Sequence, residues 1–308
     1  MSRIHEALKK AEQERAAMAQ QSGARVEPAP AAVLDPITPS GIIASASVMS
    51  VAAPSIALSP EVSLARSRQT QWNPNPKKML FFSNEEHAPG MEEFRTLRNR
   101  LYQAREKQPL SKLLVTSALP KEGKSFTSAN LAQVIVRQHG KRVLIVDADL
   151  RNPQLHVLLG AEPGPGLSEY LRSEVDECSI MQRGPMENLF FIPAGRNSGN
   201  PAELVANGRM RALLNRVEPM FDWIIIDSPP SVLVSDANQM ANYCDGVLLV
   251  VRSNSTPIDA AKRARREFAE RNVVGVVLNG ISSELTPYAQ YYYPSYGAPS
   301  TDKAVATN

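Results

Sequence analysis

Six short runs of apolar, largely β-branched residues, separated by stretches with helical spacing, limit most strongly how this chain can fold. The runs cover residues 113–116, 143–146, 189–192, 223–226, 247–251 and 273–278. They are continuously apolar rather than alternating, which is typical of strands covered on both faces. Helical stretches such as 125–138 and 257–271 lie between them. The pattern therefore predicts an α/β fold with a doubly wound, mostly parallel sheet.

The chain has 308 residues, enough for one large domain with additional segments at its ends. Residues 1–21 carry apolar residues at helical spacing and predict a short amphipathic helix. Residues 22–78 are rich in Pro, Ala and Ser without a sustained period, and predict a disordered linker. We expect the folded domain over residues 79–285 and a flexible, tyrosine-rich tail over residues 286–308.

Composition argues against several functional classes. Lys and Arg number 34 against 31 Asp and Glu, a balance of +3 that gives no reason to expect a nucleic-acid partner. Cys178 and Cys244 lack the C-x-x-C spacing of a zinc or redox site and fit a reducing cytoplasm. Residues 1–21 lack the apolar core of a secretory signal, and residues 41–59 are too rich in Ser and Ala to predict a membrane span.

A phosphate-binding sequence directly follows the first apolar run. Residues 117–125 read SALPKEGKS, between a predicted strand and a predicted helix. Gly123 lets backbone amides approach phosphates, Lys124 can reach the β and γ oxygens, and Ser125 can ligate magnesium. Ala118 occupies the position of the first glycine in the usual G-x-x-x-x-G-K-[ST] pattern, so the loop is a variant.

Two further predicted strands end in acidic residues, within VLIVDADLR and IIIDSPP. Open α/β sheets bind ligands at this edge. We expect one of Asp147 and Asp149 to face the phosphates and the other to act through water or on an acceptor hydroxyl. Asp227 occupies the position of a Walker B aspartate that holds magnesium. Each could alone be a turn or cap residue, but the three motifs together predict nucleotide binding.

Together these motifs resemble the bacterial tyrosine kinase (BY-kinase) family. That family has Ala at the first glycine position, as Ala118 here, a D-x-D-x-R motif, as at Asp147, Asp149 and Arg151, and a D-x-x-P motif starting at Asp227. The resemblance covers about residues 79–296. It implies a P-loop NTPase fold of MinD/ParA type and transfer of phosphate from ATP, with Mg²⁺, to protein tyrosines.

The resemblance also implies roles for particular residues. The implied catalytic residues are Lys124, Asp147, Asp149 and Asp227, and the implied metal ligands are Ser125, Asp147 and Asp227. The implied nucleotide contacts are Ser117, Ala118, Pro120, Lys121, Glu122, Gly123, Lys124, Ser125, Phe126 and Asn279.

Five of the eight tyrosines stand within nine residues near the C-terminus: Tyr288, Tyr291, Tyr292, Tyr293 and Tyr296. Composition alone leaves an aromatic binding or adhesive tail as an alternative. The resemblance implies instead that these tyrosines are autophosphorylation sites. Each phosphate adds nearly two negative charges at neutral pH, and we expect this charge to expel the tail from a neighbouring subunit's active site.

The family resemblance extends to assembly and partners. The helix with Glu92, Arg95 and Arg98 matches the E-x-x-R-x-x-R oligomerisation helix of the family. The match implies a homo-oligomer, which we expect to be a ring. The alternative is that these side chains form exposed ion pairs within their own helix. The implied partners are a separate membrane polysaccharide co-polymerase (a chain-length determinant adaptor) that activates the kinase, and a cognate tyrosine phosphatase. We expect a cytoplasmic protein, peripheral at the inner face of the cell membrane through a partner, that regulates exopolysaccharide or capsule synthesis or export and chain length. SRIHEALKKAEQER at the N-terminus also resembles kinases of exosortase-linked clusters.

Two questions stay open at the level of sequence. MinD/ParA-like ATPases share the variant loop architecture, although they generally have a lysine early in the loop, where this chain has Leu119. A nucleotide-switched assembly module without tyrosine phosphorylation is therefore the alternative function. A basic turn formed by Lys262, Arg263, Arg265 and Arg266 is by default a solvated face, with attraction to an anionic membrane or an adaptor tail as the alternative.

Overall fold

The structure is a computed structural model that describes residues 64–82, 90–196 and 199–281. All of these residues belong to one compact unit, Ile56–Asn308. The predicted N-terminal helix, most of the predicted linker and the tyrosine cluster lie outside the described residues. No helix among the described residues is both long and apolar enough to cross a membrane.

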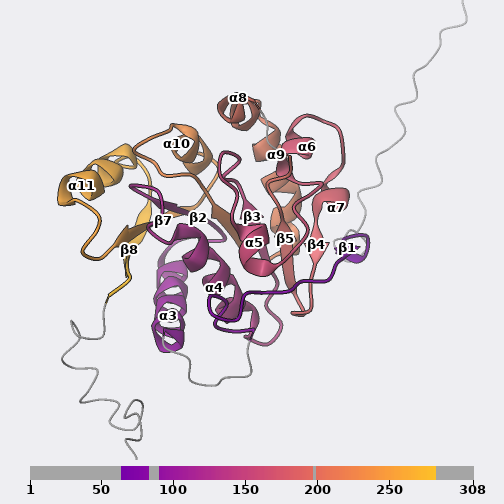
Figure 1. The fold of residues 1–308 in the computed structure, drawn as a ribbon, viewed down its shortest axis with the longest axis horizontal. Helices are drawn as coiled ribbons and strands as arrows, with labels where there is room; N and C mark the ends of the chain where they lie inside the picture. Colours follow the sequence, from indigo (N-terminus) through magenta and orange to yellow (C-terminus); the bar gives the residue numbers. More distant parts are fainter. Residues whose placement is uncertain (1–63, 83–89, 197–198, 282–308) are drawn as a thin grey trace, which may run out of the picture. The chain divides into compact units, whose positions relative to one another are not determined.

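The described residues form an eight-stranded sheet with the order β1-β4-β5-β3-β6-β2-β7-β8 (Figure 1). Every neighbouring pair is parallel except β4 and β5. The strands are β1 (Arg68–Gln69), β2 (Lys112–Ser117), β3 (Val143–Asp147), β4 (Gln182–Arg183), β5 (Leu189–Ile192), β6 (Trp223–Asp227), β7 (Gly246–Arg252) and β8 (Val273–Asn279). The predicted mostly parallel sheet is thus confirmed, and all six apolar runs are strands.

Helices cover both faces of this sheet (Figure 1). They are α3 (Met91–Lys107), α4 (Lys124–Val136), α5 (Leu155–Leu159), α6 (Leu167–Leu171), α7 (Glu177–Ile180), α8 (Pro201–Ala206), α9 (Arg209–Val217), the 3-10 turn η1 (Glu218–Met220), α10 (Asp236–Ala241) and α11 (Ile258–Glu267). One core lies between the sheet and α3, α4 and α5, and the other lies between the sheet and α6, α8, α9 and α10.

Strand β2 shows why the apolar runs are continuous. Leu113 and Val115 pack into the core beside α3 and α4, whereas Leu114 packs into the core on the opposite face. All three side chains are fully buried. A central strand of a doubly wound sheet has no solvent-facing side, so an alternating pattern would place polar groups in a core.

The folded domain begins earlier than residue 79, so the predicted extent of the linker is wrong at its C-terminal end. Strand β1 pairs with β4, and the Trp72 ring packs edge-on against Phe191 with ring centroids 6.0 Å apart. The prediction averaged composition over a long window rich in Pro, Ala and Ser and gave no weight to one large aromatic residue. We call residues 68–82 the strap.

The strap is fixed to α4 by buried amide side chains. Asn130 donates to the Lys78 carbonyl oxygen and accepts from the Leu80 N–H, at 2.9 Å in both cases. Gln133 accepts from the Phe81 N–H at 3.3 Å. Both amides are fully buried, and their pairing with backbone groups avoids the cost of unsatisfied polar atoms. The strap therefore supports the helix that begins at the phosphate-binding sequence.

Candidate active site

The phosphate-binding sequence forms the turn between β2 and α4, as predicted. Ser117 is the last residue of β2, and its hydroxyl donates to the Leu119 carbonyl oxygen at 2.8 Å. Gly123 precedes α4 with a φ of +98°, which favours glycine. A Cβ atom at Gly123 would also lie 1.9 Å from Nδ2 of Asn279. The backbone conformation therefore favours glycine here, and any larger residue would also have to displace the Asn279 amide.

Glu122 holds the loop closed from inside. Its buried carboxylate accepts from the Leu119 N–H at 2.8 Å and from the Thr256 hydroxyl. The Asn279 amide donates to the Glu122 carbonyl oxygen at 2.9 Å. Because Thr256 follows β7 and Asn279 ends β8, these two neighbouring strands help to fix the shape of the loop.

The outer part of the loop is held by Arg252 at the end of β7, which donates to the Lys121 carbonyl oxygen at 3.2 Å. The Lys121 side chain and Pro120 are exposed, while Ala118 is fully buried. Sequence reasoning missed Arg252 and Thr256. Their only sequence signal was their position just after an apolar strand, at the ligand-binding edge of the sheet.

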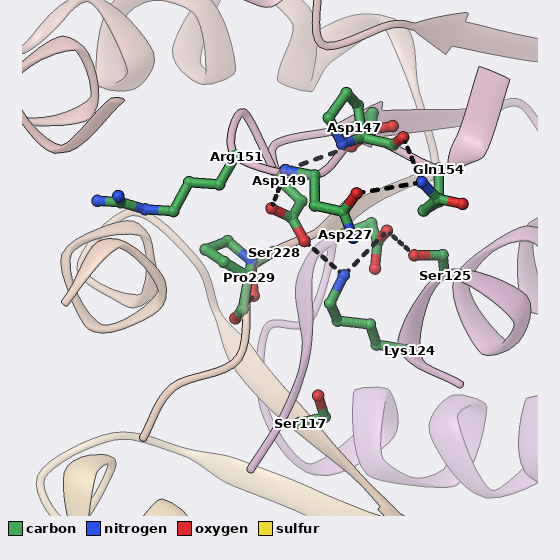
Figure 2. A network of polar contacts seen from close by, with 12 residues as sticks. Ser117, Lys124, Ser125, Asp147, Asp149, Arg151, Gln154, Asp227, Ser228 and Pro229 are labelled. Carbon is green, nitrogen blue, oxygen red and sulfur yellow. Dashed lines mark hydrogen bonds and ion pairs between the residues drawn. The ribbon is translucent and has the colours of Figure 1, made fainter. Parts of the chain in front are cut away.

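Lys124, the first residue of α4, lies between two carboxylates (Figure 2). Its Nζ is 2.7 Å from Oδ2 of Asp149 and 4.0 Å from Oδ2 of Asp227. Ser125 donates to the same oxygen of Asp227 at 2.5 Å, and Ser128 donates to its other oxygen at 3.3 Å. Residues from three separate sequence motifs thus meet at the carboxyl ends of β2, β3 and β6.

Asp147 and Asp149 bind different partners. Residues two apart in a strand face the same way, but β3 ends at Asp147, so strand geometry does not extend to Asp149. Asp149 pairs with Lys124 and also accepts from the Asn152 N–H at 3.0 Å. Asp147 accepts from the N–H groups of Asp149, at 3.3 Å, and Leu155, at 3.0 Å. Asp147 therefore fixes the segment after β3 and the start of α5.

Burial dominates the electrostatics of this cluster. Burial raises the pKa of Asp147 well above its usual range, and the nearby Asp227 charge adds to the shift. Burial also raises the pKa of Asp227. Burial alone would lower the pKa of Lys124, but the charges of Asp227 and Asp149 outweigh it and raise that pKa. Lys124 therefore stays charged, and it is the cation that the nearby aspartates share.

Arg151 of the D-x-D-x-R motif points away from Lys124 (Figure 2). Its Nε and one terminal nitrogen bind the two carboxylate oxygens of Asp236 at 2.8 and 3.1 Å. Asp236 is buried at the start of α10. The pair ties the segment after β3 to the opposite side of the site. Sequence reasoning missed Asp236, since the motif does not indicate which distant residue its arginine contacts.

Two other predicted groups lie away from this cluster. The Phe126 ring packs against Phe94 of α3, with ring centroids 5.8 Å apart, so its side chain belongs to the core between α3 and α4. Arg95 pairs with Glu92 on its own helix at 2.9 Å. Arg98 donates to the Val134 carbonyl oxygen of α4 at 3.3 Å. The predicted role of these α3 residues in assembly stays a prediction.

The side chains around Lys124 offer hard oxygen atoms, which suit magnesium. Within the described ranges, no group of three or more His, Cys, Asp or Glu side chains forms a preformed metal site. Magnesium commonly takes one or two protein ligands and completes its shell with water and substrate phosphates. Ser125 and Asp227 fit that smaller set of ligands.

Comparison with known proteins agrees with this geometry. A family model described as an AAA domain matches residues 122–262. Tyrosine-protein kinase YwqD of Bacillus subtilis (strain 168) is 34% identical over 204 residues, which cover 66% of this chain and 85% of that protein. The putative tyrosine-protein kinase CapB of Staphylococcus aureus is 30% identical over 216 residues, 70% of this chain and 94% of that protein.

Longer relatives and solved structures match a similar share of the chain. The chain covers only 30% of the putative tyrosine-protein kinase EpsB of Ralstonia nicotianae, which is 34% identical over 226 residues. The kinase domain of the Escherichia coli tyrosine kinase ETK superposes with a TM-score of 0.62 at 31% identity, covering 65% of this chain and 79% of that one. The fold, the geometry around Lys124 and these similarities show that the chain belongs to the family of bacterial tyrosine-protein kinases.

Proposed function

We propose that this chain transfers the γ-phosphate of ATP to tyrosines of its own C-terminal cluster: Tyr288, Tyr291, Tyr292, Tyr293 and Tyr296. The observation that carries the proposal is the meeting of Lys124, Ser125 and three aspartates at one edge of the sheet. Phosphoryl transfer depends mainly on positioning and on neutralising charge. The phosphate loop can position the phosphates, and the buried Lys124 beside it can neutralise their charge.

Each side chain has a defined task in this mechanism. Lys124 leaves Asp149 to contact the β and γ oxygens, and the loop amides around Gly123 bind the phosphates. Asp147, Asp149 or both prepare the incoming tyrosine hydroxyl, and one of the two carboxylates accepts its proton. The phenolic oxygen then bonds to the γ-phosphorus while the bond to the β,γ-bridging oxygen breaks and ADP leaves.

Magnesium fits beside Ser125 and Asp227, with Asp147 within the same buried cluster. When bound, the ion would supply positive charge that offsets the negative charge developing on the transferring phosphate. Ser125 would turn its hydroxyl from Asp227 toward the ion. The contacts of Glu122 and Asn279 would hold the loop in the shape that surrounds the phosphates.

The wider function follows the family. Relatives are named tyrosine-protein kinases, which supports the kinase over the alternative of an assembly module whose output is nucleotide hydrolysis. We propose that the chain forms a homo-oligomer through Glu92, Arg95 and Arg98. A membrane polysaccharide co-polymerase would activate the kinase at the inner face of the membrane, and a tyrosine phosphatase would remove the phosphates. This cycle of phosphorylation and dephosphorylation would regulate exopolysaccharide or capsule synthesis.

Replacing Lys124 tests the mechanism directly. The variant Lys124→Met should lose autophosphorylation by at least about 1000-fold, because a fixed cation at the transferring phosphate is lost, while the protein stays folded. Incorporation of radiolabel from ATP with magnesium measures transfer, and thermal unfolding measures stability. A folded Lys124→Met protein that still labels its tail would contradict the mechanism.

The acceptor assignment needs a separate variant. A protein with all five clustered tyrosines changed to Phe should hydrolyse ATP but incorporate little label. Mapping of phosphotyrosine by mass spectrometry identifies the sites that are used. Full labelling of this variant would overturn the assignment, and hydrolysis without labelling in the unmodified chain would favour the assembly module.

A further inference from the structure

A groove of about 590 Å³ lies between α11 and the edge of the sheet formed by β7 and β8. Figure 1 shows α11 and β8 together at the orange-to-yellow end of the domain. The apolar part of its lining includes Leu249 and Val251 of β7 and Val276 and Leu278 of β8. Val276 and Leu278 are 59% and 52% exposed. Within the described residues, β8 is the last strand of the sheet.

The groove is rimmed by cations. Lys262, Arg265 and Arg266 of α11 and Arg252 of β7 line it, and no acidic residue does. Among the described residues, no ion pair involves Lys262, Arg265 or Arg266. Arg263 on the same helix differs, because it does not line the groove and it pairs with Glu267 at 3.9 Å. An apolar floor with unpaired cations suits a ligand that combines an apolar body with negative charge.

The chain itself supplies such a ligand next to the groove. Strand β8 ends at Asn279 and the sequence continues into the tyrosine cluster. Phosphotyrosine joins an aromatic ring to a group of nearly two negative charges at neutral pH. Tyr288 and Tyr296 follow Ile281 by seven and fifteen positions, which permits a reach of about 25 to 50 Å at 3.3–3.6 Å per residue.

We propose that this basic groove binds the tyrosine-phosphorylated C-terminal tail of the same chain. Modification of the tail rests on the proposed function above, whereas the binding chemistry stands apart from it. Attachment through β8 gives the tail an effective concentration in the millimolar range at its own groove. Even a weak phosphotyrosine site would therefore be occupied after phosphorylation.

Occupation of the groove has two consequences. A tail held against α11 is withdrawn from active sites, so its tyrosines that are still unmodified are kept from acting as acceptors. Two residues of the groove also support the phosphate loop, since Arg252 donates to Lys121 and Thr256 donates to Glu122. A bound tail thus contacts residues that shape the nucleotide site.

A synthetic peptide tests the groove without relying on kinase activity. The protein is the full chain with its five clustered tyrosines changed to Phe, so that its own tail cannot be phosphorylated. The probe is a fluorescent peptide of residues 285–297 with phosphotyrosine at the five positions, followed by anisotropy. We expect saturable binding that weakens with salt and is at least tenfold weaker for the unphosphorylated peptide.

Matched variants locate the binding site. Lys262→Ala with Arg266→Ala should weaken binding at least tenfold, whereas Arg263→Ala should leave it within twofold. Ile258→Glu, at a 72% exposed position of the groove, should also weaken binding by placing a negative charge beside the phosphates. Thermal unfolding confirms that each variant is folded. Equal binding by the double variant and Arg263→Ala would overturn the proposal.

Two further measurements separate the tail from other occupants. Binding of the protein to vesicles that contain phosphatidylglycerol should not depend on Lys262 and Arg266. If vesicle binding does depend on these residues and the phosphopeptide does not bind, the groove is a membrane site and the proposal fails. In the natural chain after autophosphorylation, the labelled peptide should bind at least tenfold more weakly while the mass by light scattering does not rise. Unchanged peptide binding to a chain shown to carry phosphotyrosine would overturn occupation by its own tail. A failure to phosphorylate would instead count against the proposed function.

Discussion

At the scale of single residues, the burial of the carboxylates near Lys124 has a cost in stability. Three buried aspartates share one close lysine. Asp147 in particular has a raised pKa because burial disfavours its charged form. An acid whose pKa is raised on folding destabilises the folded state at higher pH. Burial of Asp147 therefore lowers the stability of the folded domain at pH values above the ordinary pKa of an aspartate.

Asp147→Asn should make this cost measurable. Asparagine keeps an oxygen for the Leu155 N–H but loses the acceptor of the longer, 3.3 Å bond from the Asp149 N–H. Removal of the buried charge should outweigh that loss, so the unfolding temperature should rise by about 2–4 °C, as for a net gain of about 1 kcal/mol. Autophosphorylation should fall at least about 100-fold, as expected when a general base is lost. A lower stability of Asp147→Asn than of the unmodified protein at pH 7.5 would contradict this prediction, because it would show that the carboxyl group of Asp147 stabilises the folded state.

Glu169 shows the opposite behaviour away from the site. It accepts from the N–H groups of Gly166, at 2.8 Å, and Arg196, at 3.0 Å, and from the Arg196 guanidinium, also at 3.0 Å. Burial alone would raise its pKa, but these hydrogen bonds lower it from 4.5 to about 2. The ionised form of Glu169 thus fixes α6 against the segment after β5.

The lowered pKa predicts a pH dependence of stability. The contribution of Glu169 is present above pH 4.5 and is lost as the pH falls toward 2, with a total of up to about 3 kcal/mol. Urea unfolding at pH 6, 4 and 3 measures it by comparing the unmodified chain with Glu169→Gln. The difference in free energy of unfolding between the two proteins should shrink as the pH falls. A constant difference would mean that Glu169 does not titrate in this window.

At the scale of elements, the strap connects the beginning of the domain to the phosphate loop. Trp72 packs against Phe191 and donates from its indole nitrogen to Thr70 at 2.9 Å. Farther along, the strap binds the buried amides of α4, whose first residue is Lys124. A loss of packing in the strap is therefore expected to reach the nucleotide site through one helix.

Trp72→Ala should lower the free energy of unfolding by about 3–5 kcal/mol, because a large buried aromatic side chain is removed. Trp72→Phe is the matched control: it keeps an aromatic ring beside Phe191 and loses the hydrogen bond to Thr70, and should cost about 1–2 kcal/mol. Chemical denaturation followed by circular dichroism measures both. Equal stability of Trp72→Ala and the unmodified protein would show that the strap is not part of the cooperative fold.

At the scale of the whole molecule, assembly and chemistry are predicted to use different surfaces. Glu92 and Arg95 form an exposed pair within α3, which contributes little to the stability of the monomer. Arg98 is less suitable for a test, since it also donates to Val134 of α4. Arg95 can therefore be changed with little effect on the fold.

Arg95→Ala should lower the mass of the assembly seen by sedimentation velocity while the unfolding temperature stays within about 2 °C. Arg263→Ala on α11 removes a comparable exposed pair from another surface and should leave the assembly unchanged. Autophosphorylation should fall with the loss of assembly if tails are modified between subunits. An unchanged mass for Arg95→Ala would assign Arg95 to the intrahelical pair alone.

Local sequence patterns determined the sheet, the turn between β2 and α4, and the position of the aspartates after β3 and β6. These features depend on neighbouring residues: continuous apolar runs fit strands covered on both faces, and a glycine and a lysine before a helix fit a phosphate site. The start of the domain was placed too late, since a single buried Trp72 outweighed the composition around it.

Only the tertiary structure decided which distant residues meet. The pairing of Lys124 with Asp149, the contact of Thr256 with Glu122, the partner of Arg151 and the basic groove beside β8 all join separate strands or helices. These contacts follow from the order of strands in the sheet and from the direction of each side chain at its edge. Local periodicity carries neither kind of information, because it specifies the faces of an element but not the neighbours of that element.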